Sequence, residues 1–268
     1  VKLMGWVQLN VGLVRSKNGS AIDSARQLFT QIEPLVVKWR KWGCLDCYFL
    51  MRKPPDVRLR FFSIGQELII RSALSSAMKL LLVRGIISEF FFSEYQPETI
   101  RFGGIEAMNI IHDYFDLDTH NWLALDRLAQ KNQRMIDPDL LLPSLFQDLF
   151  DRVLGDKISV LKTWYHLAAL TPLPPSAETL RSIDLPPFDQ LSLTAGVTNC
   201  EYSILQTYIL AHQKLATALS ELWQADLLLT DLYEILATIA LFSFNRHGFP
   251  GERSAPIVTA VIANLDLA

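Results

Sequence analysis

Apolar and polar residues alternate in several short stretches of the first hundred residues, which is typical of strands with one buried face. The predicted strands cover residues 6–11, 48–52, 57–62 and 86–95. Between them, apolar side chains recur every three or four positions, which predicts two helices. These helices cover residues 20–43 and 65–83. Ser20 is suited to cap the first helix, and Gly43 is suited to end it.

This order of elements, strand-helix-strand-strand-helix-strand, predicts a ferredoxin-like sheet lobe over residues 1–103. The helical spacing then continues, so residues 104–268 are expected to form a helical lobe, with a proline-rich loop at 171–190. The expected helices cover residues 104–115, 120–135, 140–154, 158–169, 200–223, 228–244 and 254–265. The predicted fold class is therefore α+β, with both lobes forming one integrated domain.

Composition narrows the classes of function. The chain has 268 residues, half of them hydrophobic, which is enough to bury a substantial core. A net charge of −3 argues against strong attraction to nucleic acid, so any anion must be bound by a local group of arginines. The longest apolar stretches, residues 80–87 and 235–244, are too short for a bilayer, and no membrane partner is expected.

Cysteine usage favours a reducing, cytoplasmic setting, because an odd number of thiols does not form a disulfide framework. The three cysteines are Cys44, Cys47 and Cys200. The first two have CxxC spacing, but they lead into an extended stretch and lack a second Cys/His pair, so a structural role is expected. The sequence also lacks a phosphate loop and a nucleotide fingerprint, so neither cofactor nor metal is expected.

Two arginines in the strand at residues 57–62 are the first candidate for chemistry. Side chains alternate along a strand, so Arg58 and Arg60 are expected on one face, with Leu59 and Phe61 packing on the other. Two neighbouring guanidinium groups suit a carboxylate or phosphate. The alternative is a solvated sheet face on which local acidic residues pair with the arginines.

The second candidate is the turn that precedes the helical lobe. Glu98 and Arg101 flank this turn and are suited either to pair with each other or to orient a ligand. Gly103 and Gly104 follow, and they allow a tight turn at a helix start, where backbone N–H groups can bind an anion. Such a glycine pair is also common at helix starts that bind nothing.

Taken together, these segments resemble the C-terminal glutamate-elimination domain of lantibiotic dehydratases and the related thiopeptide-type bacteriocin biosynthesis proteins. The resemblance is strongest in the first 120 residues and looser beyond. The matching residues are Trp6, Arg52, Pro54-Pro55, Arg58-Leu59-Arg60, Tyr95, Pro97-Glu98-Thr99, Arg101-Phe102-Gly103-Gly104, Glu106-Ala107-Met108 and Asn245-Arg246.

The resemblance implies a carbon–oxygen lyase that tailors ribosomally made peptides. In this family, glutamate is eliminated from glutamylated Ser or Thr of a precursor peptide, which leaves a dehydroamino acid. The resemblance assigns Arg58, Arg60, Arg101 and Glu98 to the glutamate-handling site. It implies two partners, the precursor peptide and a separate tRNA-dependent glutamylation protein, and family members often form homodimers. We therefore expect the three arginines and the glutamate to converge between the two lobes.

One departure from the family pattern leaves other functions open. The family usually has a histidine four residues before its late Asn-Arg pair, and Leu241 occupies that position here. His247 follows the pair but is expected to face elsewhere on the helix. The loss of the histidine favours a relative that forms a pyridine ring by [4+2] cyclisation of two dehydroalanines. A non-catalytic domain that binds a leader peptide on a strand edge, or an α+β protein without a ligand, also fits the sequence.

We expect structural roles for the remaining histidines and for a group of acidic residues. His112, His120, His166 and His212 are expected to be surface or capping residues. The acidic residues near position 116 are expected to form a solvated group at a helix end rather than a metal site. These residues are Asp113, Asp116 and Asp118.

Overall fold

A computed structural model describes residues 5–134, 136–171, 183, 185–193 and 197–267. The chain divides into two compact units, Val1–Pro97 and Glu98–Ala268. We call them the sheet unit and the helical unit. The predicted α+β class is confirmed, with a small antiparallel sheet at the N-terminus and helices after it.

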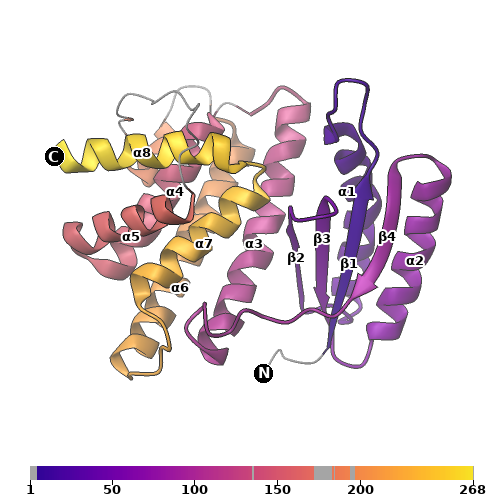
Figure 1. Cartoon of the computed structure of the whole chain (residues 1–268), viewed down its shortest axis with the longest axis horizontal. Helices are drawn as coiled ribbons and strands as arrows, with labels where there is room; N and C mark the ends of the chain where they lie inside the picture. Colours follow the sequence, from indigo (N-terminus) through magenta and orange to yellow (C-terminus); the bar gives the residue numbers. More distant parts are fainter. Residues whose placement is uncertain (1–4, 135, 172–182, 184, 194–196, 268) are drawn as a thin grey trace. The chain divides into compact units, whose positions relative to one another are not determined.

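The sheet unit has the predicted ferredoxin-like order of elements (Figure 1). Its four strands are antiparallel, and β1 and β3 lie in the centre of the order β2-β3-β1-β4. Its elements are β1 (Trp6–Leu13), α1 (Ile22–Lys41), β2 (Cys47–Met51), β3 (Val57–Phe62), α2 (Glu67–Val83) and β4 (Ile87–Ser93). The predicted strands and helices are therefore confirmed, with bounds that differ by a few residues.

The two faces of this sheet differ in chemistry. The helix-packed face is apolar: Leu9 pairs with Leu59 across β1 and β3, both are fully buried, and the ring of Phe61 lies 5.9 Å from that of Trp39 on α1. We call the opposite face the polar face, because Gln8 of β1 and Arg60 of β3 pair on it. Alternate positions of β1 and β3 therefore divide between an apolar face and a face with buried polar side chains.

The ends of α1 agree with the sequence in one respect and differ in another. Gly43 follows the helix with a φ of 66°, a left-handed conformation that glycine adopts readily, so the predicted end is confirmed. At the other end the N-cap is Ala21, one residue later than predicted. Ser20 still accepts a hydrogen bond, since its Oγ lies 3.3 Å from the backbone nitrogen of Ile22.

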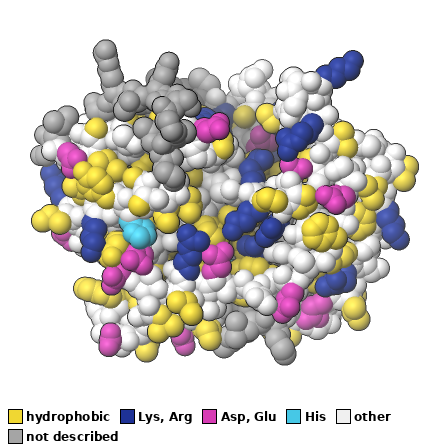
Figure 2. All heavy atoms as spheres, viewed as in Figure 1, with side chains coloured by type: hydrophobic (Ala, Val, Ile, Leu, Met, Phe, Trp, Pro, Cys, Tyr) yellow, Lys and Arg dark blue, Asp and Glu magenta, His cyan; other side chains and the backbone are white. Residues whose placement is uncertain are grey.

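The two cysteines of the CxxC spacing are not joined by a disulfide bond. Cys47 is buried and begins β2, as expected for a pair that leads into an extended stretch, while Cys44 precedes the strand. On the part of the surface formed by this unit, hydrophobic side chains are interspersed with charged ones (Figure 2).

The helical unit is built around α7, which contacts α3, α4 and α5 (Figure 1). Leu236 and Ile239 of α7 are fully buried. The elements of this unit are α3 (Ile105–Gln130), α4 (Pro138–Leu154), α5 (Lys157–Leu170), the short 3-10 helix η1 (Phe188–Leu193), α6 (Asn199–Gln224), α7 (Leu232–Arg246) and α8 (Gly251–Leu267). None of the helices in the described ranges combines the length and apolarity that a bilayer crossing requires.

One prediction for the helical lobe was wrong. Residues 104–115 and 120–135 were expected to form two helices, but α3 runs without a break from Ile105 to Gln130. The polar residues between them do not end the helix, because Asp118 and Thr119 are fully buried inside the unit. Most of the predicted proline-rich loop at 171–190 lies outside the described residues.

Candidate functional site

Arg58 and Arg60 extend from β3 onto the polar face, as the alternation predicts. In the strand register, Arg60 pairs with Gln8, and Arg58 pairs with Asn10. Arg60 also pairs with Phe49 on β2. Because residues that pair across antiparallel strands lie on the same face, the two arginines share that face with two amide side chains.

Arg60 contacts an amide group and two aromatic rings. Its side chain is only 5% exposed, and its Nε donates a hydrogen bond of 2.8 Å to Oε1 of Gln8. The guanidinium carbon lies 4.1 Å from the ring centroid of Tyr95 and 5.2 Å from that of Phe49. Stacking on aromatic faces suits the planar guanidinium and keeps its charge. Arg60 is therefore not solvent-exposed, in contrast to the alternative of a solvated sheet face.

Arg58 has a different environment. It is half-buried, and its Nε donates a hydrogen bond of 3.0 Å to the backbone oxygen of Pro54 in the turn between β2 and β3. Among the residues that the structure describes, no carboxylate lies in ion-pair contact with Arg58. A second positive charge therefore lies two residues from Arg60 on the same face.

Sequence reasoning missed three polar residues beside these arginines. The Nε2 of Gln8 donates a hydrogen bond of 2.7 Å to Oγ of Ser93 on β4. The Nδ2 of Asn10 lies 2.8 Å from the same Oγ and 3.2 Å from the backbone oxygen of Phe91. The sequence does carry a signal for Gln8 and Asn10, because they are the polar positions of the alternating first strand.

Glu98 and Arg101 form an ion pair in the helical unit. Arg101 Nη1 lies 3.1 Å from Glu98 Oε2, and both side chains are about 40% exposed. Surface pairs of this kind stabilise a fold only weakly. Sequence analysis left open whether the two residues pair with each other or orient a ligand, and in this structure they pair. The convergence of Arg101 with Arg58 and Arg60 stays a prediction.

The connection between α6 and α7 makes two hydrogen bonds to this turn. Thr230 Oγ1 donates a hydrogen bond of 2.6 Å to the backbone oxygen of Ile100, and the backbone nitrogen of Leu229 donates one of 3.1 Å to the oxygen of Gly103. Gly103 has a φ of +82°, and a Cβ at this position would lie 2.5 Å from Cδ1 of Ile235. The positive φ therefore favours glycine at position 103, and a larger residue would also have to displace the Ile235 side chain.

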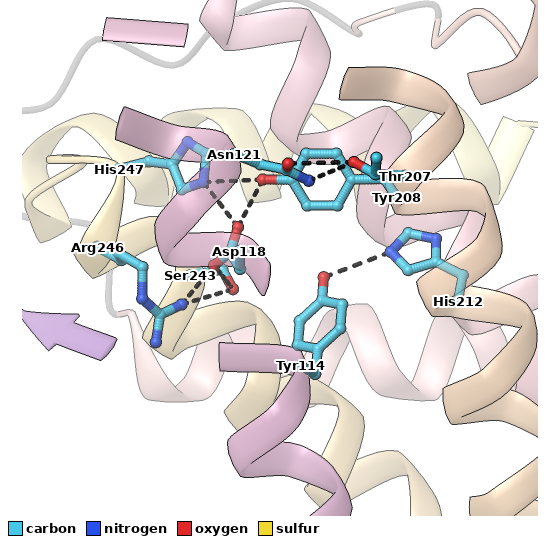
Figure 3. A network of polar contacts seen from close by, with 9 residues as sticks. All are labelled: Tyr114, Asp118, Asn121, Thr207, Tyr208, His212, Ser243, Arg246 and His247. Carbon is cyan, nitrogen blue, oxygen red and sulfur yellow. Dashed lines mark hydrogen bonds and ion pairs between the residues drawn. The ribbon is translucent and has the colours of Figure 1, made fainter. Parts of the chain in front are cut away.

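A buried network of polar side chains lies inside the helical unit (Figure 3). At its centre, Asp118 of α3 pairs with Arg246 of α7, and both side chains are fully buried. Asp118 also accepts hydrogen bonds from Tyr208 Oη at 2.7 Å, Ser243 Oγ at 2.7 Å and His247 Nε2 at 2.9 Å. This carboxylate joins α3, α6 and α7.

Charges in this network fix the protonation states. Burial alone would raise the pKa of Asp118, but the charge of Arg246 and the hydrogen bonds from His247 and Tyr208 hold it below its usual value, so the carboxylate is ionised. Burial lowers the pKa of His247 despite the contact with Asp118. Asp118 attracts a proton on His247 only weakly, because Arg246 already neutralises the carboxylate. His247 is therefore neutral and donates its Nε2 hydrogen to the carboxylate.

A second buried histidine extends the network. His212 Nδ1 lies 2.7 Å from Asp148 Oδ2, and His212 Nε2 lies 3.3 Å from the hydroxyl of Tyr114. Burial lowers the pKa of His212, and burial raises that of Tyr114 well above its usual value. Neither group titrates toward a charged form near neutral pH, so this cluster is suited to hold helices together.

These contacts correct the prediction of a solvated acidic group at a helix end. Asp118 lies within α3, is fully buried and is paired with Arg246. His212, expected at the surface or in a cap, is fully buried too. His247 is the C-cap residue of α7. Within the described ranges, no group of three or more His, Cys, Asp or Glu side chains has the geometry of a metal site.

Leu241, at the position of the family histidine, lines a pocket of about 510 Å³ in the helical unit. Asn245, one turn later on α7, lines the same pocket together with Glu252 of α8. His247 instead contacts Asp118, so the prediction that it faces elsewhere is confirmed. The pocket therefore has an apolar side chain where the family has an ionisable one.

Comparisons with known proteins agree with the resemblance seen in the sequence. The family model described as the lantibiotic biosynthesis dehydratase C-terminus matches residues 18–258. The crystal structure of the tRNA-dependent lantibiotic dehydratase MibB from Microbispora sp. 107891 aligns over 100% of this chain with a TM-score of 0.70 and 15% identity. This likeness shows a shared fold. The chain spans only 28% of the length of MibB.

A second solved structure, that of TsrL, aligns over 97% of this chain and 94% of its own length, with a TM-score of 0.47 and 14% identity. No curated protein sequence matches the chain.

The packing of Gly103 predicts that Gly103→Ala destabilises the protein by about 2–4 kcal/mol, because the new Cβ adds a clash with Ile235 to the strain of a positive φ. Gly155→Ala is the matched control. Gly155 also has a positive φ, 72°, but nothing lies within 4 Å of its Cβ position, so about 1 kcal/mol is expected. Urea unfolding measures both, and equal losses would contradict the packing argument.

The buried histidines predict that stability falls as the pH is lowered from 7.5 to 5.5. The folded-state pKa values of His212 and His247 lie below the unfolded value, so the unfolded state binds protons first. The contribution of the two histidines to the free energy of unfolding is complete above about pH 6.5. It is lost below this pH, by at most about 1.4 kcal/mol for each histidine at pH 5.5. Urea unfolding at both pH values measures the loss.

His247→Gln is the informative variant for this test. Glutamine keeps an N–H donor for Asp118 and does not titrate, so the variant should show a smaller pH dependence than the wild type. A wild-type protein that is equally stable at both pH values would mean that the histidines are not held neutral in the folded state.

Proposed function

The chain belongs to the lantibiotic biosynthesis dehydratase C-terminal family, and on this premise we propose that it eliminates glutamate from glutamylated Ser or Thr residues of a ribosomally made precursor peptide. We propose that a separate tRNA-dependent glutamylation protein attaches the glutamate to the peptide beforehand. The proposed product is a peptide with dehydroalanine or dehydrobutyrine at the modified position.

One observation carries this proposal: Arg58 and Arg60 share the polar face, and Arg60 is held by the Gln8 amide and two aromatic rings. A carboxylate placed between two guanidinium groups would relieve their mutual repulsion and accept hydrogen bonds from both. Glutamate brings such a carboxylate. Arg101 and Glu98, exposed on their turn, are proposed to complete the site.

The chemistry of elimination suits these residues. A base removes the Cα proton of the modified Ser or Thr, a Cα=Cβ double bond forms, and the Cβ–O bond breaks so that glutamate leaves as a carboxylate. Negative charge develops on the carbonyl next to Cα and on the leaving group. Arginine stays protonated throughout, so Arg58, Arg60 and Arg101 are proposed to stabilise these charges rather than to move the proton.

This proposal predicts that the protein releases glutamate from a glutamylated peptide and that Arg58→Ala and Arg60→Lys each lower kcat/KM by roughly 100-fold. Arg60→Lys keeps a positive charge but lacks the Nε–H that binds Gln8. Arg84→Ala is a matched control, because Arg84 is exposed at the end of α2. Mass spectrometry of the peptide measures the release, and no loss of glutamate by the wild type would refute the lyase.

A second candidate function, pyridine formation by [4+2] cyclisation, is favoured by Leu241, because that apolar side chain lines a pocket at the position of the family histidine. Cyclisation depends mainly on orienting two dehydroalanines and does not need a glutamate clamp. A peptide with two dehydroalanines and azole rings tests it. Release of the leader segment would support cyclisation, and an unchanged mass would exclude it.

A further inference from the structure

Ser93 ends a chain of side-chain hydrogen bonds that crosses three strands on the polar face. This series of hydrogen bonds begins at Arg60 on β3, whose Nε lies 2.8 Å from Oε1 of Gln8 on β1. It continues from Nε2 of Gln8 to Oγ of Ser93 on β4, over 2.7 Å. Ser93 and Arg60 are thus separated by one amide group.

The direction of every hydrogen bond in this chain is fixed by chemistry. A guanidinium group has only donors, so Gln8 must turn its carbonyl oxygen toward Arg60. The NH₂ group of Gln8 then faces Ser93 and must donate to it. The hydroxyl oxygen of Ser93 is therefore an acceptor in this contact.

Asn10 uses the other acceptor position of the same oxygen. Its Nδ2 lies 3.2 Å from the backbone oxygen of Phe91, which can only accept, so this end of Asn10 is the NH₂ group. The same Nδ2 lies 2.8 Å from Oγ of Ser93 and donates to it. Both lone pairs of the Ser93 oxygen are then occupied, and only its hydrogen is left to bind a partner.

That hydrogen has no acceptor within the part of the chain that the structure describes. Ser93 is only half-buried, so a ligand on the polar face can reach it. The two amides thus turn a hydroxyl, which can ordinarily donate or accept, into a group that only donates.

We propose that Ser93 binds the substrate by donating its hydroxyl hydrogen to a carbonyl oxygen of the peptide, while Arg58 and Arg60 bind the glutamyl carboxylate. This inference rests on the proposed function, because the carboxylate is that of glutamate. Gln8 is a positioning residue: it orients Arg60 and, through its NH₂ group, directs the Ser93 hydrogen toward the ligand. The ligand class is a glutamyl ester of a serine or threonine within a peptide.

Two probes separate the roles of Ser93 and the arginines. L-Glutamate offers a carboxylate without the serine peptide, and the glutamyl ester of N-acetylserine methylamide offers both groups. Calorimetry with each probe should show that Ser93→Ala weakens binding of the ester about tenfold and leaves glutamate binding within about twofold. Ser93→Thr keeps the hydroxyl and should restore ester binding. Ser88→Ala, on the same strand, is the matched control.

Gln8→Glu tests the direction of the hydrogen bonds. The carboxylate keeps the size of Gln8 and still accepts from Arg60, but it also accepts from Ser93 and so turns the hydroxyl hydrogen inward. It also places a negative charge next to Arg60. We expect binding of both probes to weaken by about 100-fold while the thermal stability is retained. A merely structural role for Gln8 predicts that this variant binds normally, and that result would overturn the assignment.

The outcomes distinguish the two proposals. If the wild type releases glutamate from the ester but Ser93→Ala binds it as tightly as the wild type, the role of Ser93 is wrong and the lyase stands. If Ser93→Ala weakens both probes equally, Ser93 only supports Arg60, and the donor role is again wrong. If the wild type binds neither probe, both the lyase and the role of Ser93 are refuted.

Discussion

The hydrogen bond between Arg60 and Gln8 is the contact on which the polar face of the sheet depends. A buried guanidinium group loses most of its hydration, and it must recover those interactions from the protein. Gln8 supplies a carbonyl oxygen, and the rings of Tyr95 and Phe49 supply aromatic faces. The positive charge is thus kept in place before any ligand arrives, so little conformational entropy is lost on binding.

The helical unit solves a similar problem in the opposite way. There the buried Arg246 has a carboxylate partner, Asp118, so the positive charge is neutralised inside the protein. The remaining acceptor positions of the carboxylate are occupied by hydrogen bonds from Tyr208, Ser243 and His247. A satisfied pair of this kind stabilises packing but attracts no anion. Because the charge of Arg246 is already matched by Asp118, we assign it a structural role.

Much of the fold could be predicted from the sequence, because burial on one face imposes period two on strands and a period near 3.6 on helices. The prediction was wrong where buried residues are polar. Asp118 interrupts the apolar spacing of α3 yet lies in its interior, since its partners come from α6 and α7. Such partners are more than 80 positions away in the sequence, so no local pattern reveals them.

The charged residues of the candidate site could be predicted from the sequence, but the residues that hold them in place could not. The alternation of arginines in β3 predicted that Arg58 and Arg60 lie on one face. No sequence pattern indicates Ser93, because its role depends on how β4 pairs with β1. The resemblance also named Arg101 and Glu98, but it did not show what fixes their turn. That support comes from a segment 130 positions later, where Thr230 binds Ile100.

Gly103 lies so close to the side chains of Ile235 and Leu228 that an added Cβ would clash with them, and this close approach links the turn that bears Arg101 to the beginning of α7. A shift of α7 along its axis would therefore carry the Arg101 backbone with it. Lengthening the connection between α6 and α7 by even one residue would have to break the hydrogen bond between Leu229 and Gly103 or displace the turn. An insertion in this connection is therefore expected to be tolerated less well than one in a surface loop that makes no such contacts.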